Sequence, residues 1–282
     1  MLMASAVGMS RVRELLFRSA NAGLIGLLGR LHRAFGIRTV YRIGADGAAA
    51  LFEGNWFVYS PRQFGSTGNI DFAQEAEDTT RRELFSRVRD GEVIYDIGAH
   101  GGVYTITLMD RFPSSSVYSF EPQPEELIAN LRLNDLPVDG VQPVAVGAEV
   151  GTVRMTTGER SSNHVSERGD REVPIVRIDD YVAARGLPPP NWIKIDIEGL
   201  ELPALRGAEQ TIKVSRPVII CEINHLHDRF GTTIAALVDW LASIGYQMHR
   251  LVDDELQPIG DVREFSALGY SADWNYWFIP RT

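Results

Sequence analysis

Short apolar runs alternate with helical patterns through this chain, and that alternation restricts its fold more than any other feature. The runs are bounded by glycine, proline or charged residues, as strands are. The segments between them place apolar residues at helical spacing. Strands are predicted at 93–98, 116–122, 141–147, 151–157, 173–179, 191–199, 216–223, 246–252 and 275–280.

Helices are expected between these strands, which gives repeated strand–helix–strand units. Such units form a mostly parallel sheet covered by helices on both faces, so the chain belongs to the α/β class. Ligands bind such a sheet beyond the carboxyl ends of its strands. The expected helices are 76–89, 102–111, 124–134, 200–213 and 232–243, and we assign the α/β domain to residues 76–282.

Residues 1–75 are expected to form an N-terminal extension that combines a basic helix with a β-hairpin. Residues 1–42 carry seven arginines and one glutamate, whereas the whole chain has a net charge of −9. The apolar stretch within residues 10–35 is too short for a membrane span, which needs about 20 residues. We favour a helix that packs on the domain or on a second copy of the chain. The alternative is a helix that lies on a membrane surface.

The hairpin is predicted at residues 46–60, with a turn at 53–55. Trp56, Phe57, Tyr59 and Phe64 either form the core of this hairpin, which we favour, or line an acceptor pocket.

The overall charge and the single cysteine restrict the partners and the location. A negative chain is not expected to bind nucleic acid, which attracts basic surfaces. Cys221 lies in an apolar run and excludes an intrachain disulfide. We therefore expect a cytoplasmic protein, with peripheral membrane contact left open.

Acidic residues end four of the expected strands. Asp96, Glu121 and Glu222 each end one strand, and Asp196 ends another, with Glu198 two residues later. Buried carboxylates are costly unless they have partners. Four of them at one edge of a sheet therefore indicate a binding site.

Around the end of the strand expected at 93–98, a carboxylate, Asp96, is followed closely by Gly98, Gly101 and Gly102. The dinucleotide fingerprint G-x-G-x-x-G is broken by His100, which argues against a dinucleotide-dependent oxidoreductase. Asp96 would also repel a phosphate. A ligand with a positive charge and a ribose, held by Glu121, fits better. S-adenosylmethionine (SAM) has that composition.

At these residues the chain resembles the FkbM-type family of class I SAM-dependent methyltransferases. The resemblance rests on VIYDIGAHGGVYT (93–105), FEP (120–122), Asn134, PVAVG (143–147), IKIDIEGLELPALRGA (193–208) and VIICEI (218–223). It implies a Rossmann-like, seven-stranded sheet and methyl transfer from SAM, usually to a hydroxyl oxygen. Asn134 is interpreted as a residue that fixes a helix end or a loop.

The resemblance also implies a cofactor site. The residues expected to contact SAM are Asp96, Gly98, Ala99, Gly101, Tyr104, Thr105, Glu121, Ala145, Val146 and Asp196.

Asp196 is the first candidate for the reaction centre, because it ends a central strand beside the expected methyl position. Glu198, Glu222 and His164 are further catalytic candidates, and a polar loop carries His164. A divalent metal is not expected; if one binds, Asp196, Glu222 and Asn224 are the candidate ligands.

The sequence therefore predicts a SAM-dependent O-methyltransferase that acts on a sugar or another small hydroxylated metabolite. The alternative is a SAM-binding or membrane-docked protein that acts through partners without catalysis.

Overall fold

The computed structural model describes residues 39–42, 48–59, 75–156, 169–223, 231–260 and 275–281. The expected basic helix at 10–35 lies outside these ranges, as do Phe64, His164 and Asn224. Within the described ranges, no helix combines the length and the apolar character that crossing a bilayer requires.

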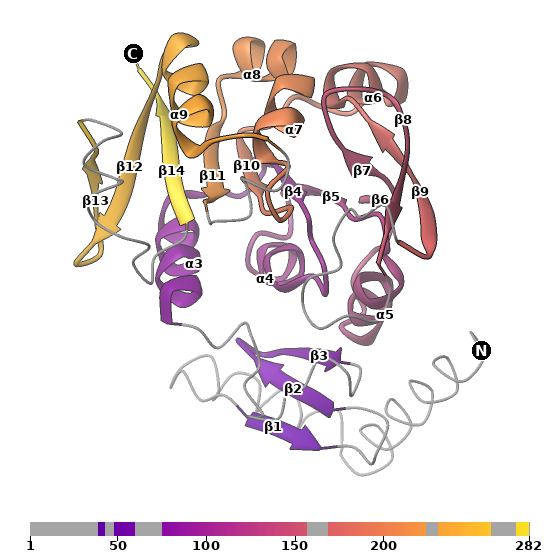
Figure 1. The fold of residues 1–282 in the computed structure, drawn as a ribbon. Helices are drawn as coiled ribbons and strands as arrows, with labels where there is room; N and C mark the ends of the chain where they lie inside the picture. Colours follow the sequence, from indigo (N-terminus) through magenta and orange to yellow (C-terminus); the bar gives the residue numbers. More distant parts are fainter. Residues whose placement is uncertain are drawn as a thin grey trace.

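A central sheet of eight strands organises the described residues, in the order β13-β12-β14-β11-β10-β4-β5-β6 (Figure 1). The five strands from β11 to β6 are parallel, whereas β14 runs antiparallel between β11 and β12. The bounds are β4 Val93–Ile97, β5 Ser116–Phe120, β6 Val141–Gln142, β10 Trp192–Ile195, β11 Val218–Glu222, β12 Tyr246–Val252, β13 Glu255–Pro258 and β14 Asn275–Pro280.

Helices cover both faces of this sheet, and a buried apolar layer lies under each group. Apolar side chains of α6, α7, α8 and α9 pack on one face, and those of α3, α4 and α5 pack on the other. The helices are α3 Glu75–Arg87, α4 Val103–Arg111, α5 Glu125–Leu133, α6 Ile178–Arg185, α7 Glu201–Gly207, α8 Glu209–Ser215 and α9 Ile234–Ser243.

Two small sheets accompany the central one. The first is antiparallel, with the order β1-β2-β3, and lies against the group of α3, α4 and α5 (Figure 1). The second has the order β7-β9-β8. Their bounds are β1 Thr39–Arg42, β2 Ala48–Phe52, β3 Asn55–Tyr59, β7 Ala145–Val146, β8 Gly151–Met155 and β9 Arg171–Val176.

The predicted α/β class, with a mostly parallel sheet and helices on both faces, is confirmed. Seven strands of the sheet match the implied set, and β13 adds an eighth after a turn at Asp253 and Asp254, whose φ angles are 51° and 62°. The single strand expected at 141–147 divides into β6 and β7 at Pro143, which has no N–H for a ladder. The helix expected at 200–213 divides at Ala208 into α7 and α8.

Candidate functional site

The acidic strand ends lie together at the carboxyl edge of the central sheet. β5, β4, β10 and β11 are consecutive parallel neighbours. β5 and β10 end just before Glu121 and Asp196, β11 ends at Glu222, and Asp96 is the last residue but one of β4. The expected gathering of these side chains therefore follows from the observed strand order.

The turn between β4 and α4 is held in a conformation that suits glycine. Gly98 and Gly102 have φ angles of 84° and 88°, and His100 between them has 48°. A Cβ on Gly98 would lie 1.9 Å from the carbonyl oxygen of Asp196. The glycine therefore lets the ends of β4 and β10 approach each other closely. Ala99, in the same turn, is buried.

Asp96 lies beneath this turn, with 3% of its surface exposed. Its Oδ2 accepts a hydrogen bond of 2.6 Å from the hydroxyl of Thr105, which also lies 2.7 Å from Oγ of Ser119. Burial raises the pKa of Asp96 to about 6, against the opposing effects of Thr105 and Lys194. Thr105, expected to contact the cofactor, is thus placed as a partner of Asp96.

Glu121 joins the turns that follow β4 and β5. Its Oε2 accepts from the backbone N–H of His100 and its Oε1 from that of Gln123, both at 2.9 Å. Burial raises the pKa of Glu121, against these bonds and the nearby His100 side chain. Each carboxylate oxygen has a second lone pair, so both can still accept from ligand hydroxyls.

Asp196 and Glu222 form a carboxyl pair at the ends of β10 and β11. The Lys194 ammonium, 3% exposed, lies 3.3 Å from Oδ2 of Asp196. Burial opposes ionisation of Asp196, but Lys194 and a hydrogen bond with Glu222 outweigh it, so its pKa is lowered. Burial and the Asp196 charge raise the pKa of Glu222 to about 11. The pair therefore holds one proton at neutral pH, on Glu222.

The turn after Asp196 is supported by Glu201, whose role the sequence did not reveal. Glu198 has a φ of 59° and Gly199 a φ of 106°, so the chain turns sharply here. Oε1 of Glu201 accepts from the N–H groups of Ile197 at 2.9 Å and Gly199 at 3.2 Å. Burial raises the pKa of Glu201 to about 7. The second acid of the E-G-L-E segment was the available signal for this support.

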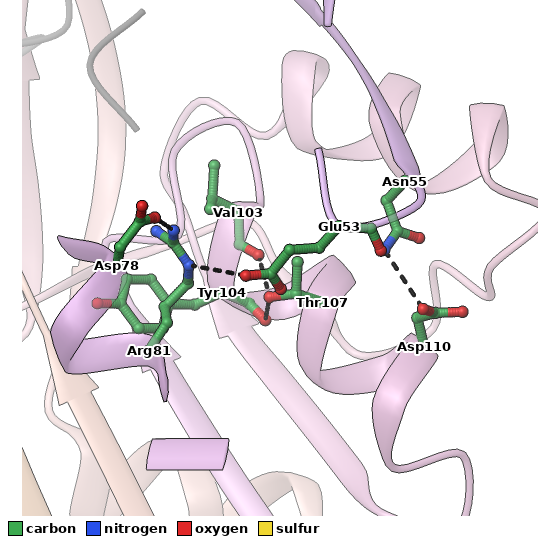
Figure 2. A network of polar contacts seen from close by, with 8 residues as sticks. All are labelled: Glu53, Asn55, Asp78, Arg81, Val103, Tyr104, Thr107 and Asp110. Carbon is green, nitrogen blue, oxygen red and sulfur yellow. Dashed lines mark hydrogen bonds and ion pairs between the residues drawn. The ribbon is translucent and has the colours of Figure 1, made fainter. Parts of the chain in front are cut away.

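Tyr104 lies between two buried cations. The Lys194 ammonium is 5.2 Å from the centre of its ring, and the Arg81 guanidinium carbon is 5.9 Å from it. Figure 2 shows Arg81 beside this ring and paired with Asp78. Nε of Arg81 lies 3.9 Å from Oε1 of Glu53 in the hairpin turn. Arg81 was missed because a single arginine in a polar helix gives no sign of burial.

For the remaining predicted site residues within the described ranges, the structure gives positions but does not test their roles. Ala145 and Val146 form β7 and are buried, and Gly101 lies against α5. Their contacts with SAM stay predictions, as does catalysis by Glu198. Within the described residues, no group of three His, Cys, Asp or Glu side chains is arranged to hold a metal. The metal and His164 predictions are untested, since Asn224 and His164 lie outside those residues.

The donor set at this edge fits SAM. Glu121 offers two carboxylate oxygens to ribose hydroxyls, and Asp96 and Asp196 offer negative charge toward a sulfonium and an ammonium. The glycine turn after β4 lies among these acids and presents backbone rather than side chains to a ligand.

A comparison with known protein families identifies the family of this chain. A family model described as a methyltransferase FkbM domain matches residues 96–248, more than half of the chain. This match includes all four acidic strand ends and leaves β1, β2 and β3 outside.

Curated relatives align at low identity. The hexuronic acid methyltransferase AglP of Haloferax volcanii is 24% identical over 51% of this chain and 61% of its own length, less than two thirds. The 31-O-demethyl-FK506 methyltransferase FkbM of Streptomyces tacrolimicus is 26% identical over 53% of this chain and 72% of its own length. Among solved structures, a methyltransferase FkbM from Methylobacillus flagellatus aligns with a TM-score of 0.46 and 21% identity, over 68% of this chain and 45% of that one.

Proposed function

Because the chain belongs to the FkbM methyltransferase domain family, we propose that it transfers a methyl group from SAM to a hydroxyl oxygen of a small hydroxylated molecule. The observation that carries this proposal is the row of acids at the ends of β5, β4, β10 and β11, with the glycine turn between them. The relatives' names support the acceptor class, since one specifies an O-methylation and the other a hexuronic acid.

The cofactor half of the site lies at β4 and β5. Glu121 would bind the ribose hydroxyls, since its carboxylate is fixed by two backbone N–H groups and needs no rearrangement. Asp96, ionised above its pKa of about 6, would attract the positive end of the cofactor. When bound there, SAM supplies a methyl group already activated by its sulfonium.

The acceptor half lies at β10 and β11. Asp196 stays ionised beside Lys194, so it can accept a hydrogen bond from an acceptor hydroxyl and orient its oxygen. When the sulfur–methyl bond of the cofactor breaks and the sulfur leaves as a neutral thioether, Asp196 would take the proton that the methylated hydroxyl oxygen loses. Glu222 holds a proton at neutral pH and is therefore uncharged. It keeps its hydrogen bond to Asp196 without repelling the negative charge of that carboxylate.

Methyl transfer from isotopically labelled SAM to a panel of sugars and other hydroxylated molecules tests the proposal. We expect label on an oxygen of at least one acceptor, with loss of transfer in Asp196→Asn. Binding of SAM without transfer to any member of the panel would instead support the non-catalytic alternative.

A further inference from the structure

The β2–β3 hairpin is attached directly to the helices that surround the glycine turn. The side chain of Asn134, at the end of α5, binds both backbone groups of Trp56: its Oδ1 accepts from the N–H and its Nδ2 donates to the carbonyl, each at 2.7 Å. Phe57 is 0% exposed and packs in a buried cluster with Ala99 of the turn and Ile106 of α4.

Further contacts hold the end of the hairpin. Nδ2 of Asn55 lies 3.4 Å from Oδ2 of Asp110 on α4, and Glu53 lies near Arg81 on α3 (Figure 2). The hairpin is therefore joined to three helices on one face of the sheet.

A chain of hydrogen bonds continues from the hairpin to the glycine turn. Nδ2 of Asn134 also donates to the carbonyl of Asn130 at 2.7 Å. The side chain of Asn130 is 0% exposed, and its Nδ2 donates to the carbonyl of Gly101 at 2.9 Å. Trp56 of the hairpin is thus linked to Gly101 through Asn130 of α5 and Asn134, the residue that caps this helix.

The turn is also pressed against α5. A Cβ on Gly101 would lie 2.8 Å from Oε1 of Glu126, and one on Gly102 would lie 2.5 Å from Cδ1 of Leu127. A displacement of α5 would therefore change the turn.

We propose that the β2–β3 hairpin is a positioning element for the glycine turn, and that Asn134 and Asn130 are the positioning residues that connect them. The proposal rests on the proposed function, in which this turn binds SAM. A turn with three glycines has many accessible conformations, and ordering it on binding would weaken affinity. Contacts from the hairpin and α5 order it beforehand. The hairpin lies outside the residues that the family model matches.

Asn134→Ala tests this role, with Asn191→Ala as the matched control. Oδ1 of Asn191 accepts from the N–H of Val93 at 2.8 Å, so the control removes an asparagine side-chain bond at the opposite end of β4. We expect Asn134→Ala to raise the Kd for SAM about tenfold by calorimetry at 15 °C, the effect of one lost hydrogen bond. Amide hydrogen exchange at 98–102 without SAM should become faster in that variant. The control should leave both quantities unchanged.

Equal SAM affinity and equal exchange in Asn134→Ala and the wild type would overturn the proposal, and so would equal losses in both variants. If Asn134→Ala does not fold, Phe57→Leu provides the same comparison, with Phe112→Leu at the far end of α4 as its control. Absence of SAM binding in the folded wild type would refute the proposed function instead. The exchange of residues 98–102 would still decide the positioning role.

Discussion

Gly98 and Asp196 touch through their backbones at the centre of the site: a Cβ on Gly98 would lie 1.9 Å from the carbonyl oxygen of Asp196. One residue belongs to the expected cofactor turn and the other to the expected reaction centre. Their contact sets the spacing between the two halves of the site.

Gly98→Ala should therefore destabilise the protein by about 3 kcal/mol or more, because it combines a backbone clash with a φ of 84°. Gly91→Ala is the control, since Gly91 has a similar φ of 93° and a Cβ placed on it would meet nothing within 4 Å. The free energy of unfolding of Gly91→Ala should fall by only about 1 kcal/mol. Urea unfolding measures both, and equal losses would contradict the close contact.

Asp96→Asn should make the protein more stable while weakening SAM binding. The pKa of Asp96 rises to about 6 in the folded state because of burial. Its protonated form is thus favoured by folding, so its contribution to stability is present below pH 4 and is lost as the pH rises through 6. At pH 7.5 the variant should gain roughly 1–3 kcal/mol, and at pH 4 the gain should vanish. If Asp96→Asn instead lowers the free energy of unfolding by the same amount at pH 7.5 and at pH 4, the charge of Asp96 does not destabilise the folded protein.

Glu222→Gln should retain most of the turnover, whereas Asp196→Asn should lose it. Glu222 already holds a proton at neutral pH, so a glutamine amide can replace it as a hydrogen-bond donor to Asp196. We expect a decrease in kcat of no more than about threefold for Glu222→Gln and of about 100-fold for Asp196→Asn. Glu222→Gln should bind SAM with nearly wild-type affinity, and Asp196→Asn should lose much less affinity for SAM than turnover. The reverse order of kcat values would show that the proton belongs to the other carboxyl group.

Arg81→Met should destabilise the protein much more than Arg82→Met on the same helix. Arg81 is 0% exposed and interacts with Asp78, Glu53 and the Tyr104 ring. Removal of a buried ion-pair partner costs about 3–5 kcal/mol. Arg82 is 65% exposed and lies 3.7 Å from Asp254, so its loss should cost less than about 1 kcal/mol. Similar midpoints of urea unfolding for the two variants would contradict the buried network.

The local elements of this fold could be predicted from the sequence because each is encoded by neighbouring residues. β12 and β14 have the expected bounds, and β4 and β5 end within two residues of them. β1 was not predicted, and neither was β13, which depends on two residues with positive φ at Asp253 and Asp254. Short edge strands carry little apolar periodicity.

The acids of the site could also be predicted, since a charge at the end of an apolar run is visible in the sequence. Their partners could not. Asn134 was correctly interpreted as fixing a helix end or a loop, but its partner Trp56 is 78 residues away. Lys194 lies on an apolar strand, and its pairing with Asp196 became visible only in the structure. Such pairings depend on the packed tertiary structure rather than on local pattern.

Calorimetric titration of the full chain with SAM tests the central claim most directly, with Glu121→Leu measured alongside. We expect one binding site in the wild type and an affinity at least about tenfold lower in the variant, because two ribose hydroxyls lose their carboxylate. No heat of binding from a folded wild type, or equal affinity in the variant, would contradict the assignment of this edge of the sheet as a SAM site.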